Sequence, residues 1–277
     1  MKQQDAERFA DMVSGPDEYI NLAEAALLVA RLEYPDLEPE QYLLRLDFLA
    51  EQCRARLAAA PSTAAVVTVL NDYLFREIGF RGDLQTFNDP RNSYLNEVLD
   101  RRMGIPITLS LIYMEIGARL GVRVDGISFP GHFLVRVDHG PDGVILDPFG
   151  GGHALDRAEL QRRLDGIGSA RNWNLDELLQ AASRREIIGR MLRNLKAIYL
   201  EREDFPRALE SVNLILDVFP QRPEEFLDRA RVHERLECVR AAIADYEQYL
   251  FLAPAANDAG RVQARLTELK GSAARLH

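Results

Sequence analysis

GIPITLSLIYMEIGARLG, at residues 104–121, is the stretch that decides the fold of this chain. Apolar side chains leave it almost no polar face, which predicts a central helix over about 105–120 that is buried on all sides. Three further runs follow, VDGISF at 124–129, HFLVRV at 132–137 and GVILDPF at 143–149. Their β-branched and aromatic residues, bounded by Gly, Pro and Asp, predict strands. The segment 81–173 is therefore expected to form an α+β core with a small antiparallel sheet.

The second and third of these runs are joined by DHGPDG at 138–143, which is strong turn chemistry and predicts an antiparallel hairpin. In such a hairpin, residues whose numbers add up to about 280 face each other, so His132 is expected beside Asp147 to Phe149. Neighbours across a sheet lie roughly 5 Å apart. Asp147 can then accept a hydrogen bond from the imidazole and orient it, as the third member of a nucleophilic triad does.

The chain before the core is expected to be helical from about 17 to 80. Pro39 suits the first turn of one helix, and Ser62 or Thr63 suits the N-cap of another. The three runs with helical spacing of apolar residues are EYINLAEAALLVARLEY, PEQYLLRLDFLAEQCRARL and STAAVVTVLNDYLFREIGF. These helices are expected to pack on the core as a bundle.

The chain from about residue 185 onward repeats itself with a period of 34 residues. Leu192, Tyr199, Ala208, Val212 and Pro220 match Phe226, His233, Ala242, Tyr246 and Pro254. That period, with a small residue where two helices cross and a proline closing the second helix, resembles the tetratricopeptide repeat. Two repeats leave open ends that need covering, and the tail after Asn257 can supply a capping helix. Three regions are therefore predicted, at 1–80, 81–184 and 185–277.

Composition excludes several classes of function. A formal charge of −9 over 277 residues argues against a protein that coats nucleic acid. No apolar run reaches the roughly 20 residues that cross a bilayer, so no membrane partner is expected and the protein is predicted to be cytoplasmic. Cys53 and Cys238 stand far apart, which suggests neither a disulfide framework nor a zinc site. The GGG at 150–152 lacks the context of a phosphate loop, and no cofactor is expected.

A long and specific motif now supports a family resemblance. NSYLNEVLDRRMGIPITLSLIYMEIGARLGVRVDGISFPGHFLVRV, with LDPFGG after it, closely resembles the SirB1 family, also described as UPF0162. The resemblance implies a bacterial protein with a transglutaminase-like, papain-like core, preceded by helices and followed by tetratricopeptide-like repeats. In active members of the superfamily a cysteine opens the central helix, and His132 and Asp147 match the second and third positions of the triad. Counting back from Leu120 and Gly121 puts the cysteine position near Pro106, where this chain has no thiol.

Other side chains leave alternatives open. Thr108 and Ser110 are the only hydroxyls in the first turn of the helix, and either is an alternative nucleophile for a hydrolase or acyltransferase of peptidase or amidase type. Asn96, Arg101 and Arg102 precede the helix and are candidates to bind a carboxylate or peptide group in a cleft beside His132. Cys53 has the spacing of a core residue, and Cys238 falls in the turn between two helices.

The leading interpretation is a non-catalytic transglutaminase-like protein. It keeps the His132 and Asp147 pair as a remnant of the triad and acts as a regulatory scaffold that binds a protein or peptide through the repeat region. In a third interpretation the core is only a structural platform for the repeats.

Overall fold

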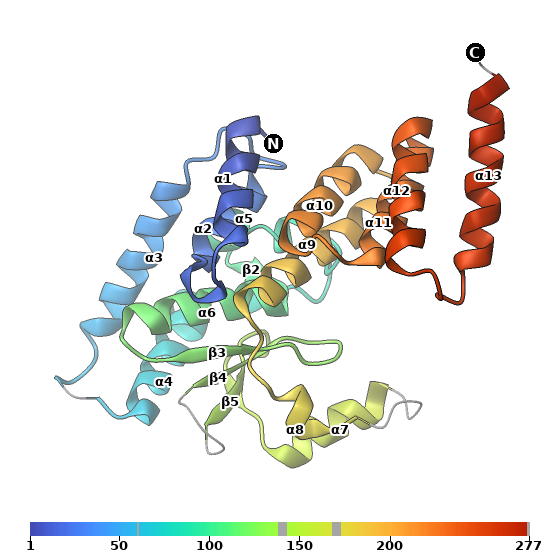
Figure 1. Ribbon diagram of the computed structural model, residues 1–277. Coiled ribbons are helices and arrows are strands. Elements are labelled where there is room, and N and C mark those ends of the chain that lie inside the picture. The colour runs from blue at the N-terminus through green and yellow to red at the C-terminus, as the bar shows by residue number, and fades with distance from the viewer. Residues whose placement is uncertain (60, 138–142, 168–172, 276–277) are drawn as a thin grey trace. The chain divides into compact units, whose positions relative to one another are not determined.

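The computed structural model describes residues 1–59, 61–137, 143–167 and 173–275 (Figure 1). Contacts divide the chain into two compact units. The core unit is Pro16–Met191, and the repeat unit combines Met1–Gly15 with the chain from Leu192 onward. The α+β prediction is confirmed, whereas the region limits at 80 and 184 stay a prediction.

The helices predicted before the core are present. Asn21 begins α2 by accepting a hydrogen bond from the Glu24 N–H, and Ser62 begins α4 by accepting one from the Ala65 N–H. Pro39 occupies the first turn of its helix, as the sequence predicts. The elements are η1 (Asp17–Tyr19), α2 (Leu22–Ala30), α3 (Pro39–Arg54), α4 (Thr63–Asn71) and the π-helical η2 (Asp72–Glu77).

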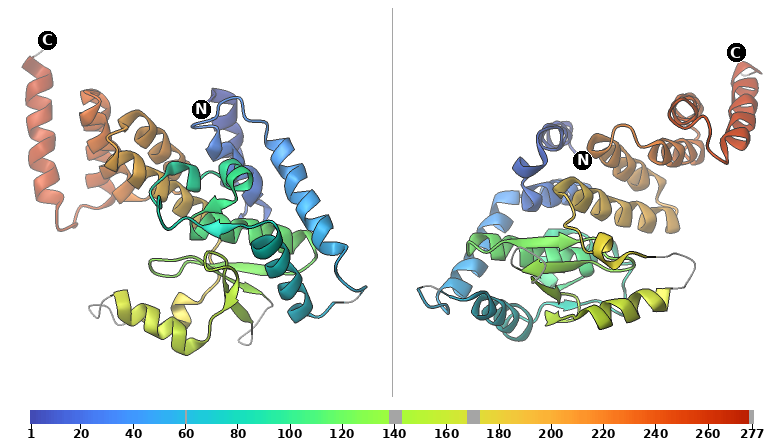
Figure 2. Two further views of the ribbon diagram at one scale, coloured as in Figure 1. Left: turned by 180° about the vertical axis from the view of Figure 1, so that it is seen from behind. Right: turned by 60° about the horizontal axis from the view of Figure 1, so that its bottom comes forward.

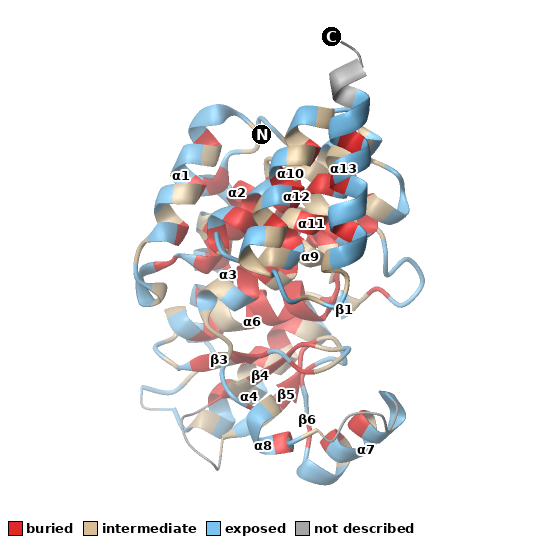
Figure 3. Cartoon of the chain, turned by 45° about the vertical axis from the view of Figure 1, so that its right-hand side comes forward, coloured by how far each residue is buried: buried red, intermediate tan, exposed pale blue. Residues whose placement is uncertain are grey.

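The predicted central helix is α6 (Pro106–Arg119), and most of its residues are buried, as the red colour of this helix in Figure 3 shows. It follows α5 (Leu95–Arg101), which ends at Arg102 in the left-handed conformation. Helices α2, α3 and α5 and strands β3 and β4 all pack against α6. Two short strands in front of α6 were not predicted: β1 (Arg81–Gly82) pairs in parallel with β2 (Met103–Gly104).

The sheet is antiparallel in the order β3-β4-β5-β6. Val135 faces Leu146 and Val137 faces Val144, so facing residue numbers add up to 281 and the predicted hairpin register is confirmed. Residues 138–142 of the DHGPDG turn lie outside the described part of the chain. The strands are β3 (Val124–Ile127), β4 (Leu134–Val137), β5 (Val144–Asp147) and β6 (His153–Ala154), of which the last was not predicted.

Both faces of the sheet are covered. Helix α6 lies on one face, and α7 (Arg157–Ile167) and α8 (Leu175–Leu178) lie on the other (Figures 1 and 2). The second face is a closed apolar cluster in which Trp173 and Ile145 are partly buried. Its buried members are Ile127, Phe129, Leu134, Leu155, Leu160, Leu164, Leu175 and Leu179.

The repeat unit consists of helical hairpins, as the 34-residue period predicts. Ala208 and Ala242 are fully buried, which agrees with their predicted place at the close crossing of two helices. The helices are α9 (Arg184–Glu201), which begins in the core unit, α10 (Phe205–Val218), α11 (Pro223–Arg235), α12 (Val239–Leu252) and α13 (Ala259–Arg275). Helix α13 packs on α12 and supplies the predicted capping helix.

One helix of the repeat unit was missed by sequence reasoning. Residues at the N-terminus form α1 (Gln3–Ser14), which packs against α10. The amino group of Met1 lies 3.1 Å from the Glu210 carboxylate. The side chains of Phe9 and Val13 are buried. Within the described residues, no helix combines the length and the apolar character that a membrane span requires.

Candidate functional site

His132 and Asp147 meet at the end of the β4–β5 hairpin, where the register argument places them. His132 lies just before β4 and Asp147 is the last residue of β5. The Nε2 atom of His132 is 2.7 Å from Oδ1 of Asp147. The Asp147 side chain is almost completely buried, and that of His132 is mostly buried. Among the described residues the other ring nitrogen, Nδ1, has no hydrogen-bond partner.

The Asp147 carboxylate is bound by two further donors. The Gly150 N–H donates to Oδ1 at 3.1 Å, and Nη1 of Arg163 donates to Oδ2 at 2.9 Å. Burial raises the pKa of Asp147, but the hydrogen bond and charge of His132, with Arg163 and Gly150, outweigh it and hold the pKa at about 2. Asp147 is therefore ionised at neutral pH, and it anchors helix α7 through Arg163 as well as orienting the imidazole.

Aromatic rings surround the imidazole. The ring of Phe149 meets that of His132 edge to face, with centroids 5.7 Å apart. Phe87 meets Phe149 in the same way at 6.2 Å. Gly82 packs so closely against Phe149 that a Cβ atom there would collide with the ring. Half of the Phe87 side chain is exposed, so this aromatic row runs from the surface to His132.

Arg190 holds the loop that carries His132. Its guanidinium, on α9, donates to the carbonyl oxygen of His132 at 2.5 Å, to that of Phe129 at 3.2 Å, and to Oγ of Ser128 at 2.6 Å. Gly131 within this loop has a φ of 65°, a conformation that glycine adopts at little cost. Neither Arg163 nor Arg190 was singled out from the sequence. Both lie on helices that follow the motif, and no local pattern marks them.

The first turn of α6 contains no thiol. Pro106 is its first residue and is buried. Oγ1 of Thr108 accepts a hydrogen bond from the Ile105 N–H at 3.1 Å and lies 2.8 Å from the carbonyl oxygen of Asn92, to which it can donate. Oγ of Ser110 donates to the carbonyl oxygen of Phe133 at 3.4 Å. Both hydroxyl side chains are fully buried, and their use as nucleophiles stays a prediction.

Two of the three candidate binding residues before α6 already have hydrogen-bond partners in the fold. Nη1 of Arg101 donates to Oδ1 of Asn92 at 3.1 Å, and Nη1 of Arg102 donates to the carbonyl oxygen of Ile78 at 3.1 Å. Asn96 is buried, and its Oδ1 accepts no hydrogen bond from the described residues. A role for these side chains in binding a ligand stays a prediction.

Neither cysteine lies in the first turn of α6. Cys53 is fully buried in α3, and burial raises the pKa of its thiol to about 11. Cys238 is exposed at the start of α12, in the turn where the sequence places it. Over the described ranges, no three His, Cys, Asp or Glu side chains gather in a way that could hold a metal ion.

Comparison with protein families agrees with this architecture. Residues 40–193 match the family model described as transglutaminase-like superfamily. Residues 195–267 match the model described as tetratricopeptide repeat. The two matches together cover most of the chain and follow each other in the order that the resemblance implies.

Individual relatives extend the similarity to nearly the whole chain. A UPF0162 protein of Xylella fastidiosa strain Temecula1 is 36% identical over 264 residues, which are 94% of this chain and 94% of the relative. A UPF0162 protein of Pseudomonas aeruginosa strain PAO1 is 33% identical over 253 residues, 90% of each chain. F-box only protein 21 of Homo sapiens is 27% identical over 204 residues, which are 67% of this chain and 31% of that protein.

Proposed function

The chain belongs to the UPF0162 family, and from that premise we propose that it is a non-catalytic scaffold that binds a protein or peptide. The observation that carries the proposal is the chemistry of the first turn of α6. Pro106 has neither a nucleophilic side chain nor an N–H. The hydroxyls of Thr108 and Ser110 are buried and hydrogen bonded to backbone groups. None of these three side chains is therefore an exposed nucleophile that the imidazole of His132 could activate.

The His132 and Asp147 pair has a structural reason to persist without catalysis. Asp147 is hydrogen bonded to His132 at the start of β4, to the Gly150 N–H and to Arg163 on α7. Removing one partner from a buried, hydrogen-bonded charge costs several kcal/mol because the charge that remains is uncompensated. The pair thus holds the hairpin end and α7 together.

The repeat unit is the proposed binding part. Tetratricopeptide repeats stack helices into surfaces that partners can occupy, and α9 to α12 form two such hairpins. The alternative is a hydrolase or acyltransferase with Ser110 or Thr108 as nucleophile. Activity measurements distinguish it from a binding scaffold.

Two measurements test the proposal on the intact protein. In the first, a library of peptide amides is incubated with wild type and with His132→Gln, a variant that keeps a hydrogen-bond donor beside Asp147. We expect no turnover above the variant's background and no labelling by a fluorophosphonate probe. Turnover that disappears in His132→Gln, or labelling that disappears in Ser110→Ala or Thr108→Val, would establish catalysis and refute the scaffold.

In the second measurement, a displayed library of random peptides is passed over the immobilised protein. We expect a related set of sequences to be retained. A library from which nothing is retained would contradict binding through the repeats. Retention that is lost in His132→Gln would instead place the binding surface at the core.

A further inference from the structure

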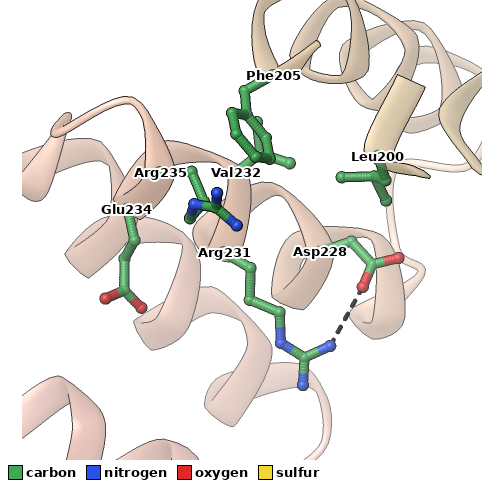
Figure 4. Close-up of a pocket in the computed structure, with 7 residues that line it drawn as sticks. All are labelled: Leu200, Phe205, Asp228, Arg231, Val232, Glu234 and Arg235. Atoms are coloured by element: carbon green, nitrogen blue, oxygen red, sulfur yellow. Dashed lines mark hydrogen bonds and ion pairs between the residues drawn. The ribbon is translucent and has the colours of Figure 1, made fainter. Parts of the chain in front are cut away.

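A pocket of about 430 Å³ lies within the repeat unit, between α9, the first residue of α10 and α11. That volume is in the range of roughly 300–1,000 Å³ typical of ligand sites. Its apolar part consists of Leu200, Phe205 and Val232. Figure 4 shows that Leu200 and Phe205 come from the first hairpin and face residues of α11. The remaining lining residues are charged: Asp228, Arg231, Glu234 and Arg235.

Both acidic residues of the pocket already have strong partners. Oδ2 of Asp228 accepts a hydrogen bond from the largely buried ammonium of Lys196 at 2.7 Å. Oε2 of Glu234 accepts one from Nε of Arg265 at 2.8 Å, and the hydroxyl of Tyr246 donates to Oε1. The pKa of Glu234 is lowered because these partners outweigh the effect of its burial. Lys196 also binds Glu225 at 2.7 Å, so the negative charge of the pocket is compensated from outside it only in part.

The two arginines, in contrast, have unused donors. Nη1 of Arg231 makes only a long hydrogen bond, of 3.4 Å, to Asp228. Nη2 of Arg235 donates to Glu203 at 3.2 Å, and 70% of the Glu203 side chain is exposed. Exposed pairs of this kind contribute about 1 kcal/mol or less, so a ligand carboxylate can replace Glu203. Each guanidinium carries five N–H groups, and among the described residues each makes one hydrogen bond.

The positions of these arginines favour a ligand that has an anionic group next to an apolar one. Arg231 and Arg235 are four positions apart on α11, so they lie on the same face of the helix. The guanidinium of Arg235 lies over the ring of Phe205, 4.2 Å from its centroid, and so borders the apolar part directly. A ligand that reaches Arg235 with an anionic group therefore also has apolar surface beside it.

We infer that this pocket binds a short acidic and apolar segment of a partner protein, with an apolar side chain against Leu200, Phe205 and Val232 and carboxylates on Arg231 and Arg235. The inference rests on the proposed function and names the site and chemical class of its ligand. A planar carboxylate matches the guanidinium fork. A phosphate dianion is disfavoured because Asp228 and Glu234 on the same rim repel a double charge more strongly.

The test uses the full chain and three short, blocked, fluorescein-labelled peptides. Each has the same two central apolar residues, flanked by glutamates, glutamines or lysines. Fluorescence anisotropy is expected to show tightest binding of the glutamate peptide. Added salt is expected to weaken binding of that peptide, because its ion pairs form at a partly exposed rim. Equal affinity for the glutamate and glutamine peptides would overturn the inference.

Variants test the residues. The double variant Arg231→Ala/Arg235→Ala is expected to bind the glutamate peptide roughly tenfold or more weakly. Arg261→Ala is the matched control, because Arg261 is an exposed arginine of the same unit that does not line the pocket. Phe205→Ser is expected to weaken all three peptides. An unchanged affinity in the double variant would exclude this pocket.

The two levels of the proposal fail differently. If the random library yields binding sequences whose retention does not depend on Arg231 and Arg235, the scaffold function stands and the pocket assignment falls. If neither the library nor the glutamate peptide binds the intact protein, both fall together.

Discussion

Replacing Asp147 with asparagine removes the negative charge to which His132, Arg163 and the Gly150 N–H are all hydrogen bonded. Asp147 is 3% exposed, and its pKa falls from 3.8 to about 2 in the folded protein. One pH unit of such a difference corresponds to about 1.4 kcal/mol, so the ionised carboxylate contributes about 2 kcal/mol to the free energy of unfolding. Asp147→Asn is expected to lose this amount at neutral pH.

The pH dependence makes this expectation specific. Because the folded-state pKa lies below the ordinary value, the contribution is complete above an ordinary aspartate pKa of about 4. It is lost as the pH falls from about 4 to below about 2, because only below the folded-state pKa is the carboxylate mostly protonated in both the folded and unfolded states. The difference between wild type and Asp147→Asn is therefore expected to be largest at neutral pH and to shrink steadily in acid.

Urea denaturation, followed by the fluorescence of Trp173, measures the free energy of unfolding of the part of the chain that contains Asp147. Trp173 is the only tryptophan of the chain and packs against the apolar cluster to which α7 contributes. Asp165→Asn is the control, because Asp165 is an exposed carboxylate on the same helix as Arg163, and surface changes are usually worth within about 0.5 kcal/mol. A loss for Asp147→Asn that is the same at neutral and acid pH would refute the reasoning.

Three further predictions concern other parts of the molecule. Lys196→Met leaves two carboxylates without their buried ammonium and is expected to lower the free energy of unfolding at neutral pH by about 3 kcal/mol, measured in urea. Gly152→Ala places a Cβ against Asn71 at a φ of 79° and is expected to cost about 2 kcal/mol or more in the same assay. Iodoacetamide at neutral pH is expected to label the exposed Cys238 and not Cys53, which is buried and has a pKa of about 11, as peptide mass spectrometry can verify.

Each of these predictions has a contrary result. A Lys196→Met protein as stable as wild type would mean that the surrounding carboxylates do not depend on the ammonium. An unchanged Gly152→Ala would mean that the loop relaxes freely around the new methyl group. Equal labelling of both cysteines in the native protein would contradict the burial of Cys53.

Helices and strands were predictable where their cause is local. The apolar stretch of α6 and the repeat period of α9 to α12 each extend over many residues. A pattern of that length is compatible with only one kind of secondary structure. Helix α1 and the two-residue strands were missed. The apolar residues of α1 are few, and strands of two residues carry no period to detect.

The pairing of His132 with Asp147 was predictable for a related reason. In an antiparallel hairpin the register follows from turn position alone, because each residue has one facing position on the partner strand. Arg163 and Arg190 reach the same site from helices whose positions depend on tertiary packing. Charged residues with ordinary local surroundings give no sign of such a role.

By itself, the sequence determined that this chain has a buried central helix, a hairpin that joins a histidine to an aspartate, and no thiol where that helix begins. These properties follow from residue identity and short-range geometry. Only the tertiary structure decided that Thr108 and Ser110 are buried in backbone hydrogen bonds, and that arginines from α7 and α9 fasten the Asp147 carboxylate and the His132 loop. The physical reason is that the partner of a buried polar group is whichever group folding brings within about 3 Å, and distance along the chain does not reveal it.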